Sequence, residues 1–187
     1  AGIKATITGG SVTTATGRIT GTRSILFDGL GGYLSITPSA LNMLKQASFS
    51  IAFWVKFTNA TPSVSAEFIF IMYGVANSAN DYIEILRENS GSANAGELRT
   101  TFYDGGDSTI LQLATDTAWH HFVITFDGGN STGTRRTYFD GNLTSVGTDK
   151  TGLTFAAAPI TCLIGSNGAN GLVGNLDDFR IYTRALS

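Results

Sequence analysis

The sequence predicts an all-β protein, a sandwich of two packed antiparallel sheets. Short runs rich in Val, Ile, Phe, Tyr and Thr recur along its 187 residues, with Gly, Asn or Asp between them, and no segment shows a sustained helical period. Hydrophobic residues make up 42% and charged residues 14%, and 23 residues are Gly. This composition is too apolar for disorder and rich in the residue that closes turns. One sandwich of this size needs no second core, so we expect a single domain over residues 1–187.

The strands are placed where these apolar runs stand between turn residues. Asp140-Gly141 predicts a tight hairpin, because such a turn needs positive φ angles that Asp and Gly tolerate. Ser39–Lys45 is the segment best suited to a short helical turn. Gly74–Asp81 and Glu88–Gly96 are small and polar and predict loops. The expected strands are Lys4–Thr8, Ser24–Phe27, Tyr33–Ile36, Ser48–Thr58, Ala66–Tyr73, Tyr82–Arg87, Glu97–Tyr103, Thr109–Ala114, Trp119–Asp127, Arg135–Phe139, Leu143–Val146, Ile160–Gly165 and Leu172–Thr183.

The segment Ser48–Lys56 shows the alternation of a half-buried strand. One face carries the large apolar side chains and is predicted to be core, namely Phe49, Ile51, Phe53 and Val55. Trp54 falls on the other face among small residues, where it either lines a groove or is covered by a loop. Near the end of the chain, Phe179 and Ile181 alternate with polar residues and predict a second half-buried strand.

Charge and hydropathy exclude two classes of partner. The formal net charge is −2 and the Lys and Arg residues are scattered, so the chain offers no basic field to nucleic acid. No apolar run approaches the roughly 20 residues of a membrane-spanning helix, so no membrane insertion is expected. Cys162 is alone, which excludes an internal disulfide, and its apolar neighbours predict a buried packing residue.

A series of motifs stands in order along the chain. They are Phe27-Asp28-Gly29 with Gly32-Tyr33-Leu34, Phe49 to Lys56, Trp119 to Gly128, Tyr138-Phe139-Asp140-Gly141, Leu163-Ile164-Gly165 and the closing Gly174 to Ser187. Together they resemble the laminin-G-like family of the concanavalin-A-like lectin/glucanase superfamily, from Arg23 to the last residue. The resemblance implies a jelly-roll sandwich of the kind found in modular secreted proteins, cell-surface adhesins and viral appendages. The chain stops where the family's domain stops, so we expect it to be part of a longer polypeptide.

The same superfamily includes glucanases, which carry two carboxylates on one strand in the spacing Glu-x-Asp-x-x-Glu or close to it. That spacing is absent here. Glu84 and Glu88 share a strand face, but four residues separate them by about 13 Å, beyond the roughly 9.5 Å that glycoside hydrolysis uses. Asp177 and Asp178 are adjacent and are expected on opposite faces of a strand. We therefore predict that the chain is not an enzyme, with a glucanase as a remote alternative.

The resemblance also implies a structural calcium ion that joins the first and last strands. The matching positions are Asp28, in the early Phe-Asp-Gly turn, and Asp177 or Asp178, in the closing motif. Carboxylate and carbonyl oxygens are the ligands that Ca²⁺ prefers. The alternative is that these aspartates cap turns and accept hydrogen bonds from backbone amides.

Two functions remain open at this point. The first is a carbohydrate-binding module of an extracellular, cell-surface or viral protein, in which a sugar stacks on an exposed aromatic ring and bonds to loop side chains. Its candidate residues are Trp54, Tyr73, Asn77, Asn80, Asp81, Tyr82, Tyr103 and Asp104. The second is a structural or assembly domain, such as a virion decoration, a tail-fibre element or an adhesin spacer, that docks neighbouring protein subunits.

Overall fold

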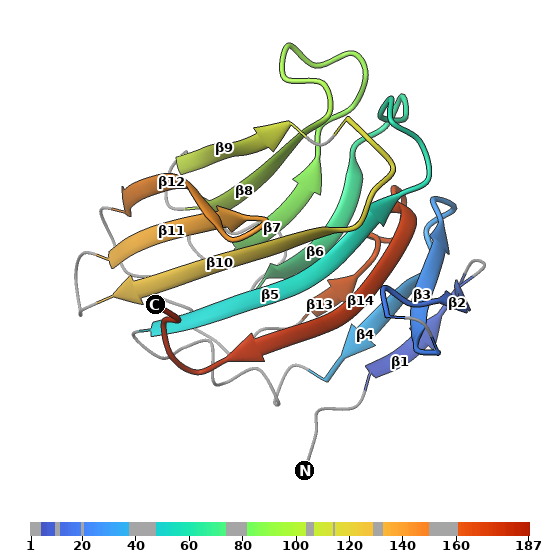
Figure 1. Cartoon of the computed structure of the whole chain (residues 1–187), viewed down its shortest axis with the longest axis horizontal. Coiled ribbons are helices and arrows are strands. Elements are labelled where there is room, and N and C mark those ends of the chain that lie inside the picture. The colour runs from blue at the N-terminus through green and yellow to red at the C-terminus, as the bar shows by residue number, and fades with distance from the viewer. Residues whose placement is uncertain are drawn as a thin grey trace.

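The computed structural model describes residues 5–9, 12–19, 21–37, 48–73, 82–103, 107–113, 115–128, 133–149 and 161–187. These residues form strands and no helix (Figure 1). In chain order the strands are β1 (Ala5–Thr8), β2 (Val12–Thr16), β3 (Arg23–Asp28), β4 (Tyr33–Ile36), β5 (Ser48–Phe57), β6 (Glu67–Tyr73), β7 (Tyr82–Arg87), β8 (Glu97–Tyr103), β9 (Asp107–Leu113), β10 (His120–Gly128), β11 (Gly133–Phe139), β12 (Asn142–Asp149), β13 (Thr161–Ile164) and β14 (Val173–Tyr182).

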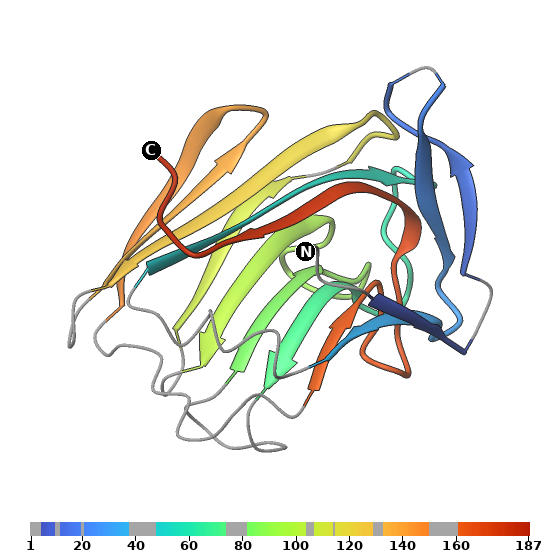
Figure 2. The same ribbon diagram turned by 90° about the horizontal axis from the view of Figure 1, so that it is seen from below.

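The strands form two antiparallel sheets that lie one over the other (Figure 2). Sheet A has the order β1-β4-β13-β6-β7-β8-β9, and sheet B has the order β12-β11-β10-β5-β14-β3-β2. Strands that follow one another in the chain often lie in different sheets, as β4 and β5 do, or β13 and β14. The predicted two-sheet sandwich is therefore confirmed.

The predicted strands are present, and one strand was missed. β2 reads Val-Thr-Thr-Ala-Thr, lies at the edge of sheet B and is largely exposed. It lacks the apolar alternation of a half-buried strand because an edge position buries little of it. The helical turn expected at Ser39–Lys45 and the loop expected at Gly74–Asp81 lie outside the described residues.

The core lies between the sheets and follows the predicted alternation of β5. Phe49, Ile51, Phe53 and Val55 are all fully buried. Their partners on β10 are apolar as well, so that Phe53 opposes Phe122 with ring centroids 5.0 Å apart. Burying a side chain of this size contributes about 1.5–3 kcal/mol. β5 and β10 therefore present apolar side chains to the core, and the next strand, β11, adds the buried Arg135 opposite Phe126.

A β-bulge in β14 changes which residues of that strand face the core. Leu176 is buried, and the register against β5 then shifts between Asp177 and Arg180, with Asp178 at a φ of 49°. After the bulge, Phe179 and Ile181 pack on the core, as predicted. The simple alternation expected for Asp177 and Asp178 is wrong, because the bulge inserts an extra residue between two inward-facing positions.

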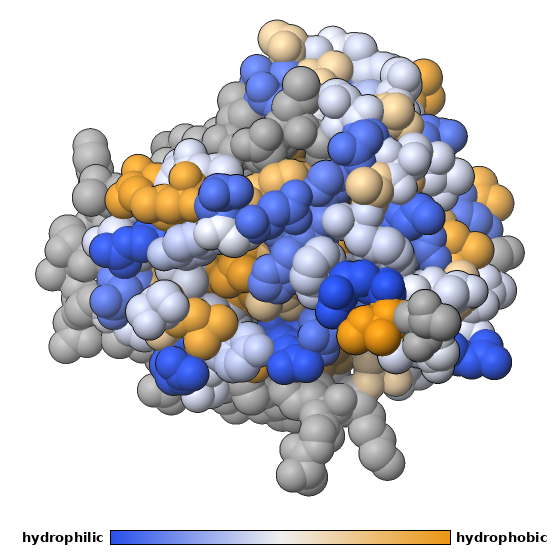
Figure 3. Space-filling model, in the orientation of Figure 1, coloured by the Kyte–Doolittle hydropathy of each residue, from blue (hydrophilic) through white to orange (hydrophobic). Residues whose placement is uncertain are grey.

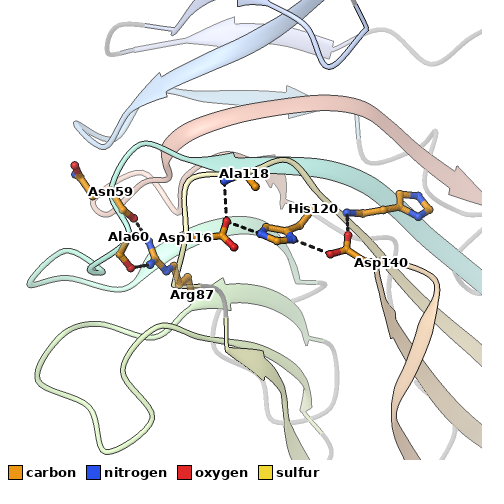
Figure 4. A network of polar contacts seen from close by, with 8 residues as sticks. Asn59, Ala60, Arg87, Asp116, Ala118, His120 and Asp140 are labelled. Atoms are coloured by element: carbon orange, nitrogen blue, oxygen red, sulfur yellow. Dashed lines mark hydrogen bonds and ion pairs between the residues drawn. The ribbon is translucent and has the colours of Figure 1, made fainter.

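A buried arginine closes one end of the sandwich. The side chain of Arg87 is fully buried, and its guanidinium lies over the ring of Phe57, 4.3 Å from the centroid. It donates hydrogen bonds to the backbone carbonyls of Asn59, at 2.9 Å, and of Ala60 (Figure 4). Glu67 lies 3.7 Å away and compensates its charge. The buried guanidinium of Arg87 thus holds the loop after β5 in place.

Gly174 provides a test of the close packing of β14 on β5. A Cβ atom there would overlap the carbonyl oxygen of Lys56 and stand 3.1 Å from the Cα of Phe57, and neither backbone atom has room to move. We expect Gly174→Ala to lower the free energy of unfolding by about 2–4 kcal/mol. Urea denaturation measures this change. Gly91→Ala is the control, because its Cβ would meet only the Asn89 side chain at 3.4 Å, and an equal loss in both variants would contradict the packing argument.

Candidate functional site

Three of the predicted ligand-binding tyrosines occupy one row across sheet A. Tyr73 of β6 opposes Tyr82 of β7, and Tyr82 opposes Tyr103 of β8. Their neighbours Met72 and Ile83 are fully buried in the core between the sheets. Because successive strand residues face opposite sides, positions 73, 82 and 103 belong to the outer face of sheet A. The register therefore groups residues that are far apart in the sequence.

The next row of this outer face contains a buried carboxylate. Glu84 lies between Ile71 of β6 and Thr101 of β8, and each of the three residues is less than 9% exposed. Burial raises the pKa of Glu84, and a hydrogen bond and the charge of Arg99 oppose that rise. An arginine on the adjoining strand thus stabilises a carboxylate that is largely removed from water.

Arg99 holds two carboxylates at once. Its Nη2 lies 3.1 Å from Oε1 of Glu84, and its Nη1 lies 2.7 Å from Oε1 of Glu88. The sequence-based separation of Glu84 and Glu88 was therefore an overestimate for their carboxylate groups, because both side chains reach one guanidinium. Each carboxylate is an acceptor in the same ion-pair cluster. We call Glu84, Glu88 and Arg99 the sheet A ion triad.

The predicted loop residues flank the tyrosine row in the chain. Asp81 directly precedes Tyr82, and Asp104 directly follows Tyr103. Asp81, Asp104 and two further predicted ligand residues, Asn77 and Asn80, lie outside the described residues. Their role in ligand binding stays a prediction.

Trp54 lies on the other sheet and does not share a site with the tyrosines. Its ring stacks against His121 of β10, with centroids 4.8 Å apart. The guanidinium of Arg18, from the turn between β2 and β3, lies 4.1 Å from the ring centroid, and the backbone N–H of Arg18 donates to Asp177 at 2.9 Å. The turn therefore covers Trp54, which was one of the two interpretations that the sequence left open. The face of the molecule formed by sheet B is a mixture of polar and apolar groups, with apolar atoms gathered over β12 (Figure 3).

The three aspartates proposed for calcium do not form a common set of ligands. Asp28 opposes Val173, so Asp177 lies four residues further along β14, about 13 Å away. Asp28 accepts the N–H of Leu30 at 2.9 Å, and the carboxylate of Asp178 pairs with Arg180 at 2.6 Å. Among the described residues, no group of three or more His, Cys, Asp or Glu side chains is arranged to hold a metal ion. The donors present do not fit a calcium ion at these positions.

Sequence reasoning missed a histidine held between two carboxylates at the start of β10. Nδ1 of His120 lies 2.8 Å from Asp140, and its Nε2 lies 2.8 Å from Asp116 (Figure 4). Asp140 also accepts the backbone N–H of His121, and Asp116 accepts that of Ala118. Burial alone would lower the pKa of His120, but the bonds to both aspartates outweigh it and leave the pKa raised. The imidazole of His120 thus ties the loop before β10 to the hairpin after β11, and the raised pKa favours its charged form.

The described residues include no helix that is long and apolar enough to cross a membrane.

Cys162 of β13 is buried, as predicted, and burial raises the pKa of its thiol to about 12. Such a thiol stays protonated and unreactive at neutral pH.

His120 predicts a fall in stability as the pH rises. A histidine whose pKa is higher in the folded state stabilises the fold below its ordinary pKa of 6.5, and that contribution is lost as the pH rises through the folded-state value. We expect the urea midpoint of His120→Gln to fall less than that of the wild type between about pH 6 and pH 9. Equal pH dependence in the two proteins would contradict a charged His120.

His121 supplies the matched control for this experiment. Burial and the nearby charge of Arg18 lower the pKa of His121, so its contribution to stability rises with pH through 6.5. The variant His121→Gln should therefore lack the gain in stability that His121 gives the wild type as the pH rises from about 5 to about 7.

The aspartate geometry predicts the response to a chelator. Because Asp28 lies far from Asp177 and Asp178, and all three carboxylates are already bonded within the chain, we expect EDTA to shift the melting midpoint by less than about 1 °C. Differential scanning fluorimetry with and without added calcium measures the shift. A drop of several degrees that calcium reverses would show a metal site built from other donors.

Solved structures of low sequence identity share this fold. Domain 4 of a GH43 extracellular arabinanase from Geobacillus stearothermophilus, in complex with arabinotriose, is 18% identical with a TM-score of 0.72, and the match covers 98% of this chain and 84% of that one. The CBM40 of the Ruminococcus gnavus IT-sialidase bound to α2,3 sialyllactose is 12% identical with a TM-score of 0.66, covering 88% and 91%. The binding domain of botulinum neurotoxin DC, in complex with rat synaptotagmin II, is 17% identical with a TM-score of 0.67. That match covers the whole of this chain and 45% of the toxin domain.

A comparison with curated proteins finds no match. The sequence model of the Laminin_G_3 family matches residues 28–187, and these residues include every strand of the sandwich from β4 to β14. The match agrees with the motif order read from the sequence and with the two-sheet architecture. The chain belongs to this family of the concanavalin A-like lectin/glucanases superfamily.

Proposed function

We propose that the chain is a non-catalytic glycan-binding module that takes its ligand on the outer face of sheet A. The observation that carries this proposal is the row of Tyr73, Tyr82 and Tyr103 at directly opposed positions of three adjoining strands. Adjoining strands lie about 4.8 Å apart, so the row spans about 10 Å. Aromatic side chains in such a row offer apolar surface to sugar rings and hydroxyl groups to their polar edges.

The proposed site combines aromatic and charged groups, as ligand sites commonly do. Glu84 is two residues from Tyr82 on the same face, and Arg99 lies one row further along β8. Carboxylates accept hydrogen bonds from sugar hydroxyls, and a guanidinium donates to their oxygens. The outer face of sheet A thus offers both partners that a sugar hydroxyl uses.

The comparisons support a glycan ligand. Two structures that share the fold hold arabinotriose or sialyllactose, and the arabinanase is an extracellular enzyme. We place the present chain in a similar extracellular, cell-surface or virion setting. The absence of the glucanase spacing from the sequence supports a binding role without catalysis, as does the engagement of Glu84 and Glu88 by Arg99.

A protein ligand is the second candidate, and the edges of the sandwich favour it. β1 and β2 are the edge strands on one side of the molecule, and neither carries a charged residue (Figure 2). Ile7 of β1 is 61% exposed. Uncharged edge strands are the positions at which another chain adds a strand, as an assembly domain would require.

The tyrosine row is tested by removing its rings. We expect Tyr82→Ala and Tyr103→Ala each to weaken binding to the best ligand of a glycan array by roughly tenfold, because a stacked ring is worth on the order of 1 kcal/mol. Isothermal titration calorimetry measures the loss. Tyr138→Ala, on β11 of sheet B, is the control and should bind as the wild type does.

Two results would contradict the proposal. One is unchanged affinity in both sheet A variants. The other is a folded protein that binds no glycan on the array, which would leave the edge strands as the candidate interface for a protein partner.

A further inference from the structure

We infer that the outer face of sheet A selects neutral glycans and rejects acidic ones. This inference rests on the glycan-binding function proposed above and concerns the charge of the sugar. Its basis is the sheet A ion triad, in which two glutamates occupy the guanidinium that an acidic sugar would need.

The strands of sheet A carry few cations. Their only basic residues are Arg87 and Arg99, and no lysine or histidine occurs in them. Arg87 shares the inner face with the core residues Ile83 and Ile85 and is fully buried, so it does not reach a ligand on the outer face. Among the strand residues, Arg99 is therefore the cation available on the outer face.

Arg99 already forms ion pairs with two carboxylates of its own chain. Both terminal nitrogens of its guanidinium bind glutamate oxygens, at 2.7 Å and 3.1 Å. Its side chain is 32% exposed, while those of Glu84 and Glu88 are 6% and 10% exposed. With all three groups ionised, the triad carries one net negative charge. A carboxylate on a sugar would either displace a glutamate from Arg99 or approach the negatively charged triad with no cation to pair with. Both are unfavourable in a site that is largely shielded from water.

A neutral sugar avoids this cost. Each terminal nitrogen of an arginine carries two N–H groups, and a single carboxylate oxygen uses one of them. The remaining N–H groups of Arg99 can donate to hydroxyl oxygens while the triad stays intact, and the glutamate oxygens can accept from hydroxyl hydrogens. The triad therefore satisfies a neutral polyol without breaking an ion pair.

The fold alone does not decide this specificity. Two structures with the same fold bind arabinotriose, which is neutral, and sialyllactose, which carries a carboxylate. We expect the charges that line the binding face to discriminate between the two classes of sugar. In the present chain Arg99 is paired with Glu84 and Glu88 on the outer face, whereas Arg87 and its partner Glu67 belong to the inner face.

The test compares neutral and acidic sugars with and without the triad. A glycan array carrying neutral, sialylated and uronate oligosaccharides is probed with the wild type and with the double variant Glu84→Gln/Glu88→Gln. We expect the wild type to bind neutral ligands at least roughly tenfold more tightly than acidic ones. The double variant, in which Arg99 is released, should gain affinity for acidic ligands by roughly tenfold, and that gain should shrink as salt is raised.

A matched control and a milder variant complete the design. Asp127→Asn removes an exposed carboxylate from β10 of sheet B and should leave the preference for neutral sugars unchanged. Glutamine keeps the shape of glutamate, and thermal melting checks that the variants fold. Glu88 lies beyond the end of β7, so the single variant Glu88→Gln disturbs the sheet less. If the double variant does not fold, this single variant should show a smaller gain in affinity for acidic ligands.

The outcomes separate this inference from the proposed function. A wild type that binds acidic sugars as well as or better than neutral ones overturns the inference and leaves glycan binding standing. A folded double variant with no gain for acidic sugars also overturns it. A folded wild type that binds no sugar overturns the proposed function, and the inference with it.

Discussion

The ring of Phe179 stacks on Phe53 of sheet B and on Phe70 of sheet A, with centroids 5.7 Å away in each case. This contact joins the two sheets, and it depends on the bulge in β14. Without the extra residue at Asp177-Asp178, the alternation that buries Leu176 would turn Phe179 toward solvent and leave a gap between the sheets. One positive φ angle at Asp178 thus fixes the side of the strand on which each later residue lies.

Because buried side chains fill the space between the sheets, the outward faces, the edges and the ends of the sandwich are the surfaces open to a ligand. The two outward faces differ in what they offer. On sheet B the largest ring, Trp54, is already covered by Arg18 and flanked by His121, so its stacking surface is used within the chain. On sheet A the register aligns three tyrosine positions beside an ion triad. The difference arises from the turn between β2 and β3, which folds over sheet B and is held there by the bond from Arg18 to Asp177.

The sequence predicted the features that depend on local pattern. The alternation of β5 identified its buried face, and Asp140-Gly141 forms the expected hairpin, with φ angles of 49° and 79°. The remaining features depend on register between distant strands. The alignment of Tyr73 with Tyr82 follows from how β6 pairs with β7, and the meeting of Glu84 and Glu88 follows from where β8 places Arg99. The spacing of two residues along a strand gives the distance between their backbone atoms. The carboxylates of Glu84 and Glu88 lie closer together than their backbones do, because both side chains extend to the guanidinium of Arg99.

Two arginines of sheet A, Arg87 and Arg99, both pair with glutamates but lie in different surroundings. Arg87 and Glu67 lie at the end of the core, and each terminal nitrogen of the guanidinium donates to one carbonyl, that of Asn59 or of Ala60, so this cluster holds a loop. Arg99 differs because its partners are two carboxylates and because it lies on an outer face with a third of its side chain exposed. The same residue type therefore has a structural role at Arg87, which holds a loop from within the core, and at Arg99 it has the recognition role that we propose.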